Sequence, residues 1–377
     1  MNLKDRIDAL HRKQGEAVFL SAMEDTVIGR RDTGADVALR MLSVLVVSVP
    51  YLLAATGVWL LWVGFPHILV MVVAALLLWL AYFLRPHRLS LPEGALERRD
   101  LPELFGVLDA ISERLNAPDI SHVLIDDGFN ATVESTRNAR LLTLGAPLWL
   151  ALSSEERVAL LAHEMAHLVN NDARRKGALG QALDQLERWS YLLAPELGQN
   201  RLSGEVYKVS HGFVADILGA LLRGLVETLQ FTLLRLSYFG AHRSEYLADA
   251  LAARVAGKAA TLGLLEKFIL VDGAPPELAG IEPRKGETGL IFLQRIAKVG
   301  IVSDPERQAE LRAKHMEQRL AVNSTHPPSC YRQAFVEALD IDCDAPAIEA
   351  PWVKVDSELA PYFDRLGEKV LTLLERQ

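Results

Sequence analysis

Two long stretches without a charged side chain stand out in the hydrophobic pattern near the N-terminus. Residues 41–63 and 65–84 contain no Asp, Glu, Lys or Arg. About 20 apolar residues in a helix cross the roughly 30 Å hydrocarbon layer of a membrane. Because Gly64 and Pro66 lie at the junction of the two stretches, the pattern predicts a transmembrane hairpin with spans 41–63 and 65–84. A hairpin buried in a water-soluble core is the alternative, although uncharged runs of this length are uncommon there.

Basic side chains flank this predicted hairpin on both sides, and its turn has none. They are Arg30, Arg31 and Arg40 before the first span and Arg85, Arg88, Arg98 and Arg99 after the second. The positive-inside rule then places both flanks in the cytoplasm. We expect a cytoplasmic N-terminal helical segment over 1–40, a membrane hairpin over 41–84 and a cytoplasmic domain over 85–377. Such a chain is a multi-pass integral protein of the cell membrane, or of the inner membrane in a bacterium.

A second apolar region, residues 206–239, has a different pattern. Four charged side chains interrupt it, namely Asp216, Arg223, Glu227 and Arg235. Their spacing places them on one side of a helix. An Arg at mid-bilayer costs roughly 2.5 to 3.5 kcal/mol on insertion scales. The pattern therefore predicts an amphipathic helix that packs on the domain or lies in the membrane interface and does not span.

Composition narrows the possible classes of protein. Half of the 377 residues are hydrophobic and 23% are charged, which excludes a disordered chain. The 48 acidic and 40 basic side chains give a net charge of −8, and this argues against nucleic acid as a partner because phosphate binding needs a basic face. The two cysteines, Cys330 and Cys343, are too few for a disulfide framework.

The remaining chain alternates helical and strand patterns. Asp100 and Glu103 form a capping-box pattern, which is followed by apolar residues at helical spacing: Leu104, Val107, Leu108, Ile111 and Leu115. Residues 122–125 and 140–143 are typical of strands, and Asp127-Gly128 between them is a turn signal. Nearly everything after Pro147 has a helical pattern. We therefore predict an α+β, mainly α, domain with a small β-sheet.

The residues that indicate chemistry lie on one predicted helix. Ser153 and Glu156 form a second capping-box pattern, and the helix that they open contains the HExxH sequence His163-Glu164-Met165-Ala166-His167. Side chains four apart in a helix lie on one face, so both imidazoles can bind a single zinc ion. Glu164 then faces the coordination position that catalytic zinc sites leave to water. Two histidines held by ordinary hydrogen bonds are the alternative.

Catalytic zinc needs a third protein ligand. The candidates downstream are His211, His242, Glu245 and Asp249. We favour Glu245, because Glu245 and Asp249 lie one turn apart on a predicted helix. One carboxylate can then bind zinc while the other accepts the free ring N–H of a ligating histidine. A solvated acidic helix face is the alternative for this pair.

Four motifs, in order, resemble those of the HtpX and CAAX prenyl protease family. They are HEMAH with Asn171-Asp172 after it, the SEYLAD sequence that contains Glu245, the Ser324-Thr325-His326-Pro327-Pro328 sequence, and Arg332. Members of this family are gluzincin-type membrane metallopeptidases. The resemblance covers about residues 100–340, and the predicted N-terminal hairpin fits HtpX-like members. The prenyl-substrate branch has many more spans than this chain, which disfavours isoprenyl processing.

The resemblance implies a zincin-like domain and a role for each matching residue. The zinc ligands are His163, His167 and Glu245, with one Zn²⁺ per chain, and Glu164 is the general base and acid. Asn130-Ala131 resembles the family motif beside the substrate-binding edge strand, although Thr132-Val133 after it departs from the family pattern. His326 is expected to stabilise the tetrahedral intermediate, with Arg332 in support.

The function that the resemblance implies is hydrolysis of peptide bonds in membrane or cytoplasmic proteins, with protein or peptide substrates and the lipid bilayer as partners. An extended substrate segment that adds a strand to the sheet near Asn130 fits this chemistry, because main-chain pairing tolerates varied sequences. A proteolytically inactive membrane adaptor that keeps the peptidase fold is the alternative, since a motif does not guarantee activity.

Overall fold

Two compact units make up the chain in the computed structural model. The model describes residues 15–23, 34–86, 91–135, 139–169, 172–193, 197–199, 206–208, 213–271, 281–317, 327–341 and 348–374. The first unit, here the sheet unit, comprises Met1–Arg31, Ser90–Arg174 and Phe239–Gln377. The second, here the hairpin unit, comprises Asp32–Leu89 and Arg175–Tyr238.

The sheet unit contains a mixed three-stranded sheet. Its strands are β1 (His122–Asp126), β2 (Ala131–Ser135) and β3 (Arg140–Gly145), in the order β1-β3-β2. β1 runs parallel to β3, with His122 opposite Leu141, whereas β2 runs antiparallel to β3, with Ala131 opposite Leu144. β2 is therefore an edge strand. The strands predicted over 122–125 and 140–143 are confirmed, but β2 was not predicted, and the Asp127-Gly128 turn leads from β1 toward β2.

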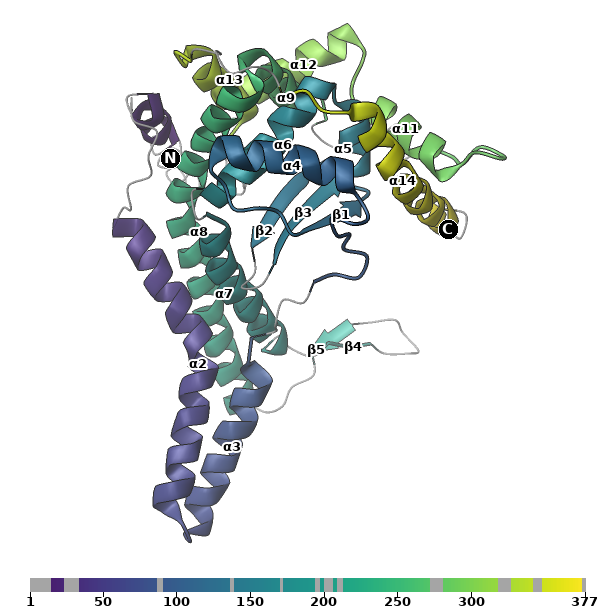
Figure 1. The fold of residues 1–377 in the computed structure, drawn as a ribbon. Coiled ribbons are helices and arrows are strands. Elements are labelled where there is room, and N and C mark those ends of the chain that lie inside the picture. The colour runs from purple at the N-terminus through teal and green to yellow at the C-terminus, as the bar shows by residue number, and fades with distance from the viewer. Residues whose placement is uncertain are drawn as a thin grey trace. The chain divides into compact units, whose positions relative to one another are not determined.

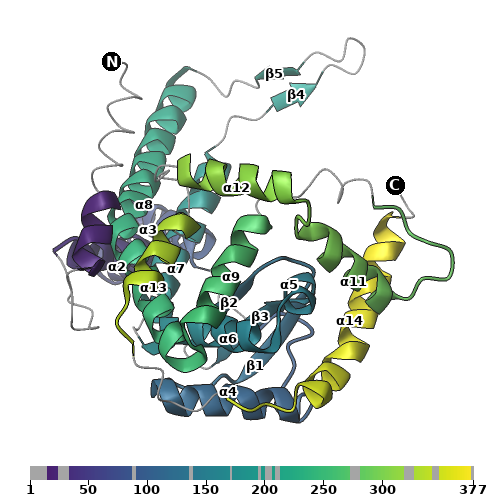
Figure 2. The ribbon, with the colours of Figure 1, turned by 90° about the horizontal axis from the view of Figure 1, so that it is seen from above.

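Helices lie above and beside this sheet (Figures 1 and 2). They are α4 (Pro102–Leu115), α5 (Ala146–Ala151), α6 (Ser154–Val169), α9 (Lys258–Leu270), α11 (Gly289–Gly300), α12 (Pro305–Glu317), α13 (Ser329–Ala338) and α14 (Trp352–Leu374). All five apolar residues predicted to form the inner face of α4 are buried, and they share one hydrophobic core with the sheet and α6. The predicted cap of α4 is wrong. Its N-cap is Leu101, followed by Pro102, and the Asp100 carboxylate instead accepts a hydrogen bond from the N–H of Glu97.

A buried arginine joins α6 to the C-terminal helix α14. The guanidinium of Arg157 lies 4.7 Å from the ring centroid of Trp149 and 5.8 Å from that of Trp352. It also donates to both carboxylate oxygens of Asp356, at 2.9 and 3.0 Å. A charge can be buried when it is paired and hydrogen-bonded, as here. This cluster fixes α6, which carries the HExxH sequence, against α5 and α14.

The hairpin unit is built from helices that expose apolar side chains. Its elements are α2 (Gly34–Gly64), α3 (Ile68–Leu84), most of α7 (Asp172–Leu192), β4 (Leu197–Gln199), β5 (Val206–Lys208) and the first part of α8 (Phe213–Ala256). α2, α7 and α8 pack together through a small core of Leu39, Val46, Ala182, Leu186, Val226 and Leu233. Outside that core many large apolar side chains are exposed, among them Trp62, Ile68 and Leu69, as expected of a surface that contacts lipid.

Two helices of the described chain are long and apolar enough to cross a membrane: Asp36–Gly64, in α2, and Asp216–Ala256, in α8. α3 is apolar as well but shorter, at 17 residues. The length and composition of α8 permit a span, so the prediction that residues 206–239 do not span stays a prediction. Two of its charges, Arg223 and Glu227, form an ion pair of 2.7 Å one turn apart, which reduces the charge that the helix presents. The helical fold with its small sheet confirms the predicted α+β, mainly α, class.

Candidate metal centre

The HExxH helix α6 begins with the predicted capping box. The backbone N–H of Ser153 donates to Glu156 Oε2 at 2.8 Å, and the N–H of Glu156 donates to Ser153 Oγ at 3.3 Å. These reciprocal bonds satisfy two of the donors that a helix start leaves open. The helix behind them is buried on nearly every side from Arg157 to Leu168. The two histidines of the motif are therefore held on a rigid, water-excluded support.

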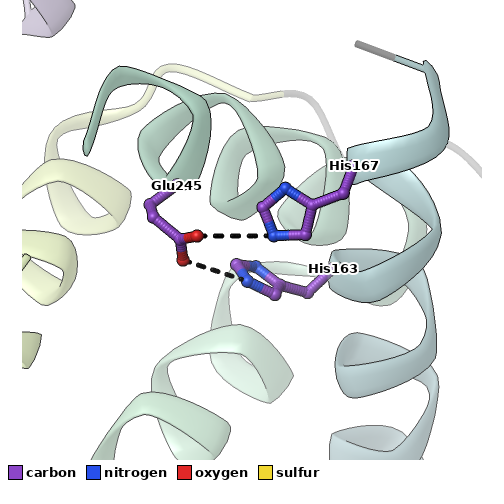
Figure 3. A group of neighbouring side chains, drawn as sticks. All are labelled: His163, His167 and Glu245. Atoms are coloured by element: carbon purple, nitrogen blue, oxygen red, sulfur yellow. Dashed lines mark ion pairs between the residues drawn. The ribbon is translucent and has the colours of Figure 1, made fainter. Parts of the chain in front are cut away.

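His163 and His167 lie one turn apart on α6, and Glu245 approaches both from α8 (Figure 3). His163 Nε2 is 3.4 Å from Glu245 Oε2, and His167 Nε2 is 3.5 Å from Glu245 Oε1. All three residues are buried, and one ligand atom from each lies within 4.8 Å of the others. Among the residues that the structure describes, His163, His167 and Glu245 form the one group of His, Cys, Asp or Glu side chains that could hold a metal ion.

The donor set and its spacing fit zinc. Two ligand atoms about 2.1 Å from a tetrahedral zinc ion lie about 3.4 Å apart, and two imidazoles with one carboxylate are a known catalytic ligand set. The separations of 3.4 and 3.5 Å match that value. Of the other candidates for the third ligand, His242 is buried in α8 but is outside the group, and His211 lies outside the described residues.

Asp249, one turn after Glu245 on α8, contacts the ring nitrogen of His163 that faces away from Glu245. Asp249 Oδ1 is 3.1 Å from His163 Nδ1. A carboxylate in this position fixes the tautomer and the orientation of a ligating imidazole. The acidic pair is buried and not solvated, so the alternative of a surface acidic face is excluded.

Arg332, on α13, completes this buried network. Its Nε donates to Asp249 Oδ2 at 2.8 Å and its Nη2 to Asp249 Oδ1 at 2.6 Å. Its Nη1 lies 3.7 Å from Glu245 Oε2. A two-point contact of this kind is the strongest ion-pair geometry that proteins use. The sequence did not predict that Arg332 would hold Asp249, which is far from it along the chain.

These contacts shift pKa values inside the site. Burial and the charge of Arg332 act to lower the pKa of His163, but hydrogen bonds to Asp249 and Glu245 outweigh them and raise it to about 9. Burial acts to raise the pKa of Asp249, but the charge and hydrogen bonds of Arg332 and His163 hold it below its usual range. Because zinc binds neutral imidazole, the metal competes with a proton at His163.

Glu164 is buried on α6 between the two histidines of the motif. Its carboxylate is close enough to Arg332 to help raise the pKa of that guanidinium. The predicted general base is therefore buried on the helix that carries both histidines and lies near Arg332. His326, the predicted stabiliser of the intermediate, lies outside the described residues, as does Asn171.

Asn130 and Ala131 lie where the chain enters β2. Asn130 is exposed, and its carbonyl accepts a hydrogen bond of 2.9 Å from the N–H of Gly145. β2 packs beside α6, and within the described residues it pairs only with β3. The free edge of β2 thus belongs to a strand that contacts the HExxH helix. Polar Thr132 and Glu134 are exposed on either side of the buried Val133. This polar–apolar alternation is the period-2 signal from which the sequence could have predicted the strand.

Comparison with known proteins places the chain in a family with this type of site. A model of "Peptidase family M48" matches residues 110–340. The chain therefore belongs to peptidase family M48, whose members are metallopeptidases, and the predicted resemblance to HtpX-like membrane members is confirmed.

The relatives are distant. A protein named "Protease HtpX homolog" from Bacteroides fragilis (strain YCH46) is 21% identical over 280 residues, which cover 72% of this chain and 81% of the relative. A second with that name, from Desulfotalea psychrophila, is 26% identical over 183 residues, covering 47% and 63%. "Protease HtpX" from Pseudomonas putida (strain W619) is 28% identical over 144 residues, covering 37% and 45%. No significant match to a solved structure was found.

Proposed function

We propose that this protein is a membrane-anchored zinc metalloendopeptidase of the HtpX type. The observation that carries the proposal is the convergence of His163, His167 and Glu245, from two helices, on one buried point beside Glu164. Family membership and the names of the relatives support the same activity. One zinc ion per chain fits the single group of ligand atoms in the described residues.

Each residue of the site has a role in this proposal. When bound, zinc supplies Lewis-acid chemistry, since it lowers the pKa of a coordinated water toward about 7 and polarises a carbonyl. Glu164 accepts the proton of the attacking water and returns it to the leaving amine. Asp249 holds the ring of His163, and Arg332 holds Asp249. His326 donates a hydrogen bond to the developing oxyanion, a contribution of roughly 3 kcal/mol for a typical donor.

The substrate in this proposal is an extended protein segment. It pairs with the free edge of β2, next to Asn130 and Ala131, through main-chain hydrogen bonds. Main-chain pairing does not depend on the side chains of the substrate, so cleavage depends on whether the segment is accessible. Accessible or unfolded stretches of membrane or cytoplasmic proteins are then cut. A quality-control role follows from such a preference.

The apolar helices anchor the enzyme. α2, α3 and α8 expose large hydrophobic side chains that suit a lipid environment, and Arg40 and Arg85 at the ends of the hairpin favour the cytoplasmic side for both flanks. We therefore place the N-terminus and the sheet unit in the cytoplasm, in a multi-pass membrane protein.

A substitution at Glu164 tests the proposal against an inactive adaptor. Glu164→Gln keeps the shape of the side chain but removes the base, so cleavage of an unfolded substrate such as casein falls by about 10² to 10⁴-fold while about one zinc per chain remains. His163→Ala is the companion variant, and it should lose the metal. Purified wild-type protein that binds zinc but never cleaves would support the adaptor, and protein that binds none would refute the metallopeptidase.

A further inference from the structure

The short helix over residues 15–23 packs against the two helices that complete the metal centre. Its apolar residues Val18, Phe19 and Ala22 contact a buried cluster formed by α8, α9 and α13. That cluster includes Tyr246 and Phe335. All of these residues belong to the sheet unit. An N-terminal segment is thus part of the packing behind the site.

Phe19 contacts two aromatic rings in this packing. Its ring centroid is 6.0 Å from that of Tyr246, at an interplanar angle of 61°, and 5.5 Å from that of Tyr331, at 69°. Both are edge-to-face contacts, the arrangement that the charge distribution of aromatic rings favours. Tyr246 also packs on Phe335, at 5.1 Å. Phe19 therefore links a residue of α8 to a residue of α13.

The two tyrosines are next to residues of the metal centre in the chain. Tyr246 follows Glu245 on α8, and Tyr331 precedes Arg332 on α13. Arg332 reaches Asp249 at 2.6 Å, so a small shift of α13 relative to α8 breaks the two-point contact between them. α13 has ten residues, and isolated helices of that length are marginal in water. Packing must therefore hold α13 in place.

We propose that Phe19 is a positioning residue for the metal centre. By holding Tyr331 and Tyr246 together, its ring keeps Arg332 on Asp249 and thereby fixes the orientation of His163. The effect on cleavage rests on the proposed peptidase function, whereas the effect on the position of α13 does not.

Steady-state kinetics of the full-length, zinc-loaded protein test the effect on cleavage. Partners behind metal ligands change activity by about 10 to 100-fold, so Phe19→Ala, one layer further out, should lower kcat about tenfold with KM and zinc content nearly unchanged. Leu20→Ala is the matched control, because Leu20 is on the same helix but 57% exposed, and it should behave as wild type. Unchanged kcat in Phe19→Ala would overturn the proposal.

A double-mutant cycle separates positioning from general destabilisation. Arg332→Lys cannot make the two-point contact. If Phe19 acts through Arg332, Phe19→Ala should lower kcat by no more than about twofold in the Arg332→Lys background. A further tenfold loss there would show that Phe19 does not act through Arg332. Phe19→Leu replaces Phe19→Ala if the latter does not fold, because it keeps most of the apolar volume.

Hydrogen exchange gives a readout that does not depend on catalysis. The amides of α13 should exchange about tenfold faster in Phe19→Ala than in wild type, while those of α4, which is remote from this cluster, and those of Leu20→Ala stay unchanged. Equal exchange in α13 would contradict the proposed positioning. If the wild type proves inactive, the peptidase function fails, but this measurement still decides the role of Phe19.

Discussion

The two ends of helix α8 show opposite relations between side-chain character and burial. In the stretch 216–237, large apolar residues such as Leu221 and Leu225 are more than half exposed. In the stretch 244–253, the carboxylates of Glu245 and Asp249 are each 1% exposed. A helix on the surface of a water-soluble protein has the reverse distribution. One continuous helix of 44 residues thus changes from an apolar surface to an acidic interior.

This contrast shows that the groups around a side chain, and not its polarity alone, determine whether it is buried. The acidic end is buried because His163, His167 and Arg332 compensate its charge, and an uncompensated charge there would cost several kcal/mol. An exposed apolar surface of this kind is typical of a region that contacts lipid or a protein partner. The buried carboxylates of α8 therefore indicate the chemistry of the site, and its exposed apolar residues indicate what surrounds that part of the helix. Four changes test this contrast.

The largest effect is expected at Glu245. Glu245→Ala removes one of the three grouped ligand atoms, and because partners behind ligands already cost about 10 to 100-fold, activity should fall on the order of 10³-fold, with loss of bound zinc. Zinc measured by atomic absorption, together with casein cleavage, checks this. Glu227→Gln, at the apolar end of the same helix, should keep both. Retained zinc in Glu245→Ala would show that the acidic end is not a ligand position.

The next effect is expected at the apolar end. Leu225→Arg should disfavour membrane insertion of α8 by about 2.5 to 3.5 kcal/mol if this stretch lies near mid-bilayer. A glycosylation-based insertion assay on the α8 segment measures the shift. For a matched control, Ile291→Arg replaces an exposed apolar residue on α11 of the sheet unit and should leave membrane retention of the full chain unchanged. An unaltered insertion of Leu225→Arg would place this stretch in water.

The acidic interior also predicts a pH dependence of metal binding. Without metal, the pKa of His163 is raised to about 9, so below that pH a proton must leave before zinc can bind. Competition with that proton should therefore make the apparent zinc affinity rise about tenfold per pH unit up to about pH 9 and level off above it. Competition with a chelator at each pH measures it. A flat profile over this range would mean that Asp249 and Glu245 do not retain the proton.

A smaller effect is expected at Asp249. Asp249→Asn keeps the shape of the side chain but removes the charge that holds His163 and Arg332, so zinc affinity should fall about 10 to 100-fold. Asp109→Asn is the control, because Asp109 pairs with Arg98 on the surface and such pairs contribute at most about 1 kcal/mol. Equal zinc affinities in both variants would show that Asp249 does not support zinc binding through His163.

Local patterns predicted the parts of the fold that depend on near neighbours. The Ser153–Glu156 cap, the inner face of α4 and the strands at 122–125 and 140–143 follow from spacing within a few residues, and all are observed. The cap at Asp100 failed because Pro102 sets the helix start one residue later. The prediction of Glu245 and Asp249 also rests on a local signal, an acidic pair at helical spacing, and the structure groups Glu245 with the two histidines.

Contacts between residues far apart in the chain could not be predicted from local sequence patterns. The parallel pairing of β1 with β3 brings β2 to the sheet edge, and no short pattern encodes which strands become neighbours. The contact of Arg332 with Asp249 likewise joins residues from separate helices.

Gly145, at the end of β3, has a consequence for how a substrate would be received. A Cβ at this position would lie 2.0 Å from the carbonyl oxygen of Gly128 and 2.7 Å from that of Asn130, so only glycine permits the loop before β2 to rest on β3. If a peptide pairs with the β2 edge as proposed, that edge is built before the peptide arrives. Binding would then spend little of its free energy on ordering the receptor, so short, weakly held peptides would also be captured.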